Sequence, residues 1–74
     1  MNTWFEVRVA LRGTKDELVS PHYASEDEAA VAVAEIRRAQ QANDFPDLPW
    51  LSVSGRDILA ASIKRRSAGV VGIA

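Results

Sequence analysis

One uninterrupted helix-forming segment most constrains how this chain can fold. Residues 26–42 contain neither glycine nor proline, and most of them favour helix. Ser25 is placed to accept a hydrogen bond from the Glu28 amide, and Glu28 to reach back, as in a capping box. At 100° per residue, one narrow face collects small apolar residues: Ala29, Ala32, Val33, Ile36 and Ala39. The sequence therefore predicts a helix from residue 26 to about 42, ended by Asn43 or Asp44, that lies close against a sheet.

Two strands are predicted before this helix. Over residues 3–11, one set of apolar residues alternates with a mixed set, the pattern of a half-buried strand. The set expected to face the core is Phe5, Val7, Val9 and Leu11; the set expected to face outward is Trp4, Glu6, Arg8 and Ala10. Gly13 lies in the turn at 12–16, and residues 17–20 predict a short antiparallel strand that Pro21 ends.

Two further strands are predicted after the helix. The loop over 43–49 is expected to turn Phe45 and Leu48 back onto the core, and residues 50–54 are typical of a third strand. Gly55-Arg56 fits a two-residue hairpin turn, which makes residues 57–64 the fourth strand. Residues 57–66 also carry apolar side chains at helical spacing, so a helix stays open as the alternative. Residues 69–74 are either a short fifth strand or a flexible tail.

The predicted architecture is a single α+β domain over residues 1–74, with element order β-β-α-β-β. One helix packs on an antiparallel sheet of about four strands. A chain of 74 residues without cysteine has a small core and no disulfide, so we expect a second subunit to add stability. The other sheet face is expected to show Trp4, Glu6, Arg8, Trp50 and Ile58. That face, or an edge strand, is the expected dimer contact.

Residues that carry chemistry are sparse. Ser20 lies two positions from His22, the single histidine, on an extended segment that does not aim the two side chains at each other. The acidic residues 26–28 are explained by helix capping and by the positive end of the helix dipole. With no cysteine and one histidine, we expect no metal and no cofactor. The prediction is a protein that is not an enzyme.

The favoured hypothesis is a small non-catalytic protein-interaction module that self-associates, most simply as a dimer. Trp4 and Trp50 are candidate interface residues because aromatic residues are enriched at interface centres, and the alternative is that both pack at the edge between sheet and helix. Val31 joins them because it is apolar on the side of the helix away from the core.

Two alternatives come from other classes of protein. The first is a nucleic-acid-binding module whose contacts are Arg56, Lys64, Arg65 and Arg66, with the hairpin bringing Arg56 near the basic run. A net charge of −1 weighs against bulk attraction to nucleic acid. The second is a small-molecule-binding protein with a site between subunits.

The layout resembles that of short proteins from actinobacteria and their phages. The resemblance lies in the leading strand, in the helix opening at residues 23–29, and in residues 53–58 followed by Ile63. It covers most of the chain and transfers neither a function nor a site residue. Because the chain is small and without evident chemistry, we expect an accessory protein of a phage or mobile element that binds a host protein.

The sequence also predicts a location. No apolar run approaches 18 residues, so we expect no membrane span. Glu6 and Arg8 lie inside the first apolar pattern, where a signal peptide would not carry charges. The expected compartment is the cytoplasm, including that of a host cell for a viral protein.

Overall fold

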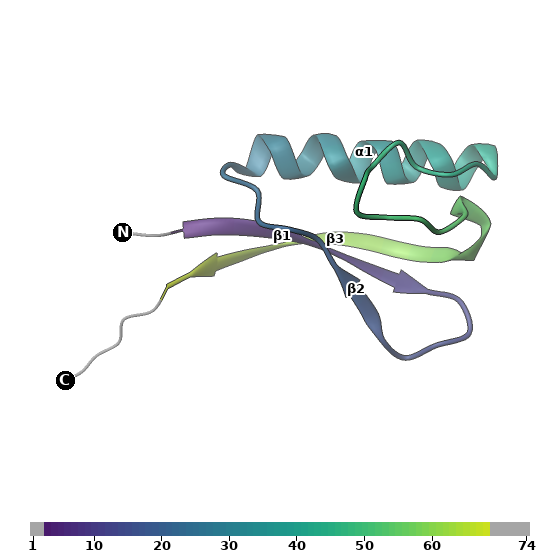
Figure 1. The fold of residues 1–74 in the computed structure, drawn as a ribbon, viewed down its shortest axis with the longest axis horizontal. Coiled ribbons are helices and arrows are strands. Elements are labelled where there is room, and N and C mark those ends of the chain that lie inside the picture. The colour runs from purple at the N-terminus through teal and green to yellow at the C-terminus, as the bar shows by residue number, and fades with distance from the viewer. Residues whose placement is uncertain (1–2, 69–74) are drawn as a thin grey trace.

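A computed structural model of the chain describes residues 3–68 and shows a small α+β domain (Figure 1). Its elements are β1 (Thr3–Leu11), β2 (Glu17–Val19), α1 (Glu26–Ala42), the 3-10 turn η1 (Gly55–Asp57) and β3 (Ile58–Ser67). The strands form one antiparallel sheet in the order β2-β1-β3, so β1 is central. α1 lies across one face of this sheet (Figure 1). The predicted fold class is confirmed, with three strands in the described residues instead of four.

α1 begins and ends where the sequence predicts. The Ser25 hydroxyl accepts a hydrogen bond from the Glu28 amide at 3.2 Å, and the Glu28 carboxylate accepts one from the Ala24 amide at 3.3 Å. Asn43 takes the left-handed conformation, with φ 53°, and its amide turns back to the last carbonyls of the helix. The buried residues of α1 are those of the predicted face: Ala29, Ala32, Val33, Ile36 and Ala39.

The core lies between α1 and the sheet. Val7 and Val9, at the centre of β1, are fully buried, as is Ile36 of the helix. Leu51 and Ile58 complete the centre. The alanines on the buried face of α1 let the helix approach the sheet closely.

β1 and β3 pair along almost their whole length, with Val7 opposite Ile63. The predicted strand over residues 57–64 is confirmed, and the helical alternative does not form. Ala10 is opposite Ala60 and Leu11 is opposite Ile58. Leu59 therefore has no partner on β1 and is the extra residue of a β-bulge.

The predicted third strand over residues 50–54 is wrong. A strand places neighbouring side chains on opposite faces, whereas Trp50 and Leu51 both pack against the core. The Trp50 indole N–H donates to the Tyr23 hydroxyl at 2.7 Å, and the Gly55 amide donates to the Asp44 carbonyl at 2.7 Å. These contacts hold the segment as a loop against α1.

Three smaller expectations also fail. The turn at Gly55-Arg56 is part of η1 and not a two-residue hairpin turn, because residues 50–54, directly before it, form no strand. Phe45 is 61% exposed, while Leu48 does pack on the core as predicted. Ile58 lies in the core and not on the outer sheet face, since the bulge at Leu59 reverses the alternation of faces at this end of β3.

Two further points concern the ends of the chain and membranes. The expected strand or tail at 69–74 lies outside the described residues. Within residues 3–68, no helix combines the length and apolar character needed to cross a bilayer.

Candidate interaction surface

β3 is an edge strand of the sheet. On the side away from β1, no strand among residues 3–68 pairs with it, and we call this side the open edge. Phe5 and Tyr23 exchange both backbone hydrogen bonds, at 2.9 and 2.8 Å, on the β2 side of β1. Phe5, Val7 and Val9 therefore direct their backbone N–H and C=O groups away from β3. Their partners on β3, namely Ala61, Ile63 and Arg65, direct their own N–H and C=O groups into the open edge.

The middle of this edge carries none of the usual protection. Sheet edges are commonly blocked by proline, by charged side chains or by a bulge. At the start of β3 the Gln40 side chain covers the edge, because its amide donates to the Ile58 carbonyl at 2.8 Å and to the Leu59 carbonyl at 3.3 Å. From Ala60 to Ile63 the strand contains neither proline nor charge. The accessible part of the edge therefore begins at Ala60.

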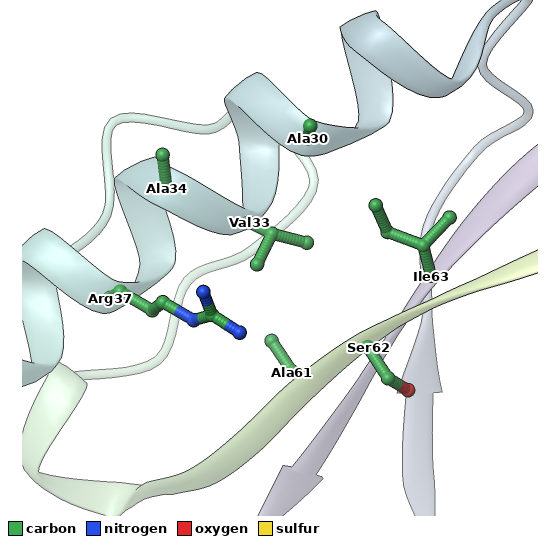
Figure 2. A pocket seen from close by; sticks show the side chains of 7 residues that line it. All are labelled: Ala30, Val33, Ala34, Arg37, Ala61, Ser62 and Ile63. Atoms are coloured by element: carbon green, nitrogen blue, oxygen red, sulfur yellow. The ribbon is translucent and has the colours of Figure 1, made fainter.

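A groove of about 350 Å³ runs between α1 and β3, beside the open edge (Figure 2). The residues that line it are Ala30, Val33, Ala34 and Arg37 of α1, and Ala61, Ser62 and Ile63 of β3. Figure 2 shows Val33 pointing from the helix toward β3 and Ile63 pointing from β3 toward the helix. The Arg37 guanidinium extends across one end of the groove, above Ala61. The surface is thus apolar in the middle and charged at that end.

The groove continues past Ile63 to a second hollow at the other end of β3. This hollow is lined by Glu26 at the start of α1 and by Arg65, together with Thr3 and Phe5 of β1. The helix side of the combined groove thus has an acidic residue at one end and a basic residue at the other.

Four exposed residues of α1 form its side of this surface, and we call them the α1 flank: Glu26, Ala30, Ala34 and Arg37. Their spacing of four, four and three residues places them in one stripe along the helix. At 100° per residue, Glu26 and Arg37 lie at about a right angle to the buried face, on the side of the groove, and Ala30 and Ala34 lie further round the helix, toward the side away from the sheet. The middle of the stripe is flat because Ala30 and Ala34 have short side chains.

The other side of α1 is covered by the loop that follows it. Arg38 pairs with Glu35 at 2.7 Å and donates to the Phe45 carbonyl at 3.3 Å, and the Asp47 amide donates to Glu35 at 2.7 Å. The hydrogen bonds from Arg38 and from the Asp47 amide lower the pKa of Glu35 to about 2, and the same pairing raises the pKa of Arg38. The loop is thus held on one side of the helix, and the α1 flank stays exposed.

The outer face of the sheet is polar. The Trp4 ring stacks on His22, with centroids 4.6 Å apart. Glu6 pairs with Arg66 at 3.2 Å and with Arg8 at 3.6 Å, and its oxygen lies 3.9 Å from the His22 ring. Desolvation acts to raise the pKa of Glu6, but side-chain hydrogen bonding and the charges of Arg66 and Arg8 together outweigh it, so this pKa is lowered. Ion pairs therefore occupy this face, and the surface is not apolar.

The three residues expected at a protein interface lie on three different surfaces. Trp4 is half-buried on the outer sheet face, under His22. Val31 is 71% exposed on the side of α1 away from the sheet. Trp50 is half-buried in the loop against the core. The structure does not bring them together.

An edge strand was expected as a possible dimer contact, but apart from Arg65, which the nucleic-acid alternative names, the residues of the open edge and of the α1 flank were not singled out from the sequence. The signals available were the uncharged stretch Ala60–Ile63 and the spacing of two alanines between Glu26 and Arg37. Neither signal indicates a surface until the helix is known to lie beside β3 with its flank toward the unpaired side.

The four cations of the nucleic-acid alternative also fail to form one surface. Arg56 precedes β3 and Lys64–Arg66 end it, roughly 25 Å apart along an extended strand. The hairpin that would have brought them closer is not formed. By alternation, Lys64 and Arg66 belong to the outer face and Arg65 to the helix face.

Ser20 and His22 do not form a nucleophile–base pair. The Ser20 hydroxyl accepts a hydrogen bond from the Val7 amide at 2.8 Å and donates to the Pro21 carbonyl at 2.7 Å, while His22 stacks on Trp4. In residues 3–68, no three His, Cys, Asp or Glu side chains lie close enough together to hold a metal ion.

The fold and this surface define a small α+β domain with an open sheet edge beside an apolar groove. Comparison with protein-family models, with curated proteins and with solved structures finds no match to this chain. The open edge and the groove beside it are the features of this chain that bear on its function.

Proposed function

We propose that this chain is a non-catalytic protein-interaction module that self-associates as a dimer through the open edge of β3. The observation that carries the proposal is the uncharged stretch Ala60–Ile63, in which the backbone N–H and C=O groups of Ala61 and Ile63 face away from β1 beside an apolar groove. An edge of this kind is a template for another strand, and strand addition is a common mode of protein recognition.

The small core supports the same proposal. The largest fully buried side chains among residues 3–68 are Ile36, Leu51, Val7 and Val9, with no aromatic side chain among them. A domain of this size gains much of its stability from a bound partner when one is present. A strand on the open edge would cover Ile63, which is now only half-buried on the helix face.

The two alternatives have less support from the geometry. Arg66 is paired with Glu6, and Arg56 lies at the far end of β3 from Arg65, so nucleic acid would meet scattered cations. The groove is open along β3, so a small molecule would need a second subunit to enclose it. A host protein, as expected for a phage accessory factor, would use the same open edge.

A proline substitution at Ala61 tests the proposal. The Ala61 amide points into the open edge, so Ala61→Pro removes a donor from that edge without removing a hydrogen bond to β1. Val19→Pro is the matched control, because Val19 opposes Arg8 and directs its own amide away from β1, at the β2 edge. Circular dichroism establishes that each variant is folded.

The readout is the solution mass by light scattering over a dilution series. We expect the wild type and Val19→Pro to show twice the 8.1 kDa chain mass, and Ala61→Pro to show the mass of one chain. A wild-type mass of one chain at every concentration contradicts the proposal. So does a folded Ala61→Pro variant that is as dimeric as the wild type.

A further inference from the structure

We infer that the two copies are related by a two-fold axis through Ser62, so that their α1 flanks pack against each other as an antiparallel helix pair. The inference rests on the proposed function and adds to it the geometry of the assembly. In this assembly the α1 flank contacts the second copy. Pairing of the open edges alone would not require that contact.

The register of β3 favours an antiparallel pair of strands at the open edge. An antiparallel pair centred on Ser62 sets Ala61 of one copy opposite Ile63 of the other, and both residues direct N–H and C=O groups into the open edge. Lys64 then lies opposite Ala60, beyond the reach of the other copy's basic run. A parallel pair would instead set the two runs at 64–66 side by side. Charge repulsion therefore favours the antiparallel arrangement.

The spacing of the two α1 helices across this axis suits direct helix packing. α1 packs against both β1 and β3, so its axis lies over the space between these strands. With strands about 4.8 Å apart, the axes of the two helices lie about 10 Å apart across the two-fold axis. Helices pack at about 8–10 Å. Sheet twist over two strand spacings rotates the helices by about 40–50°, close to a common helix crossing angle. Ala30 and Ala34 are small enough for this approach.

The charges on the α1 flank are self-complementary. An antiparallel pair centred between Ala30 and Ala34 sets Ala30 of one copy against Ala34 of the other. The same operation sets Glu26 of one copy near Arg37 of the other, once on each side of the axis. Like charges would meet only if the helices ran parallel.

The strand and the helix indicate the same axis independently. α1 runs antiparallel to β3, since Gln40 contacts Ile58 at one end and Glu26 shares a hollow with Arg65 at the other. Ser62 therefore lies level with the middle of the α1 flank, and it lines the groove together with Ala30 and Ala34. The two-fold axis that the β3 register places at Ser62 thus also passes between Ala30 and Ala34, where the helix charges place it.

Paired charge reversals test the geometry. Glu26→Arg sets two arginines against each other across the axis, and Arg37→Glu sets two glutamates against each other, so each variant alone is expected to dimerise about 10- to 100-fold more weakly than the wild type. In a mixture of the two variants, every contact is again between opposite charges. We expect the mixture to form heterodimers with an affinity near that of the wild type. The control, Asp27→Arg, changes an acidic residue of the same helical turn off the flank.

The readout is sedimentation at low salt, where surface charges are least screened. Restored association on mixing, with Asp27→Arg dimeric throughout, supports the inference. If the wild type is dimeric and neither reversal weakens it, the helix pairing is wrong while the proposed function stands. If both reversals weaken the dimer and mixing restores nothing, the two-fold pairing of Glu26 with Arg37 is also wrong. A monomeric wild type refutes the proposed function itself.

Discussion

Of the two glycines that the structure describes, Gly55 leaves less room for an added methyl group. Gly55 begins η1, and its amide donates to the Asp44 carbonyl at 2.7 Å. A Cβ at this position would lie 2.1 Å from the carbonyl oxygen of Ala39 and 2.6 Å from the amide nitrogen of Gln40. Both are backbone atoms at the end of α1, so no side chain can rotate to make room.

The loss in the free energy of unfolding in a Gly55→Ala variant depends on how far η1 must move away from α1. An ordinary contact to a Cβ is about 3.4–4 Å, so η1 must move away from α1 by more than 1 Å, on the order of the overpacking strain that costs about 1–3 kcal/mol or more. Leu51 and Ile58 flank the turn in the core and would lose packing as well. We expect a loss of about 3 kcal/mol or more, out of roughly 4–11 kcal/mol for a domain of this size.

Urea unfolding followed by circular dichroism, at one fixed protein concentration, measures this loss. Gly13→Ala is the comparison, because Gly13 has φ +85° and no atom within 4 Å of an added Cβ. That variant should lose only the conformational strain of a left-handed residue, about 1–2 kcal/mol. A Gly55→Ala variant that loses less than Gly13→Ala would refute the close approach of η1 to α1.

Two further predictions concern Ser20 and Glu35. Ser20→Ala should destabilise the fold by about 1–3 kcal/mol in urea unfolding, because the buried Val7 amide loses its hydrogen-bond acceptor; a loss no greater than that of an exposed serine would contradict this. The pKa of Glu35 is lowered from 4.5 to about 2, so its contribution to stability is complete above about pH 4.5 and is lost as pH falls toward 2. The difference in melting temperature between the wild type and Glu35→Gln should therefore shrink over that range, and a difference independent of pH would contradict the ion pair with Arg38.

The helix and the three strands of the sheet could be predicted because their signals are local. The segment 26–42 carries its own cap at Ser25, and the buried face follows from helical period alone. Strand β1 follows from strict alternation over 3–11. These patterns do not depend on the rest of the chain.

The failures come from tertiary contacts that no local pattern contains. Residues 50–54 have strand-like composition, but Trp50 finds a hydrogen-bond partner in Tyr23, 27 positions earlier in the chain. The bulge at Leu59 moved Ile58 into the core. The candidate surface was missed for the same reason, since β3 pairs directly with β1 and leaves its other side open.

Concentration-dependent hydrogen exchange at the open edge tests the central claim most directly. The amides of Ala61 and Ile63 point away from β1, so pairing with a second copy should slow their exchange as protein concentration rises. The amides of Glu17 and Val19, which point away from β1 at the β2 edge, should exchange at an unchanged rate. Slowing at residues 61 and 63 alone is the predicted result. An unchanged rate at these two residues in a sample whose mass has doubled would contradict the account, because the copies would then associate through another surface.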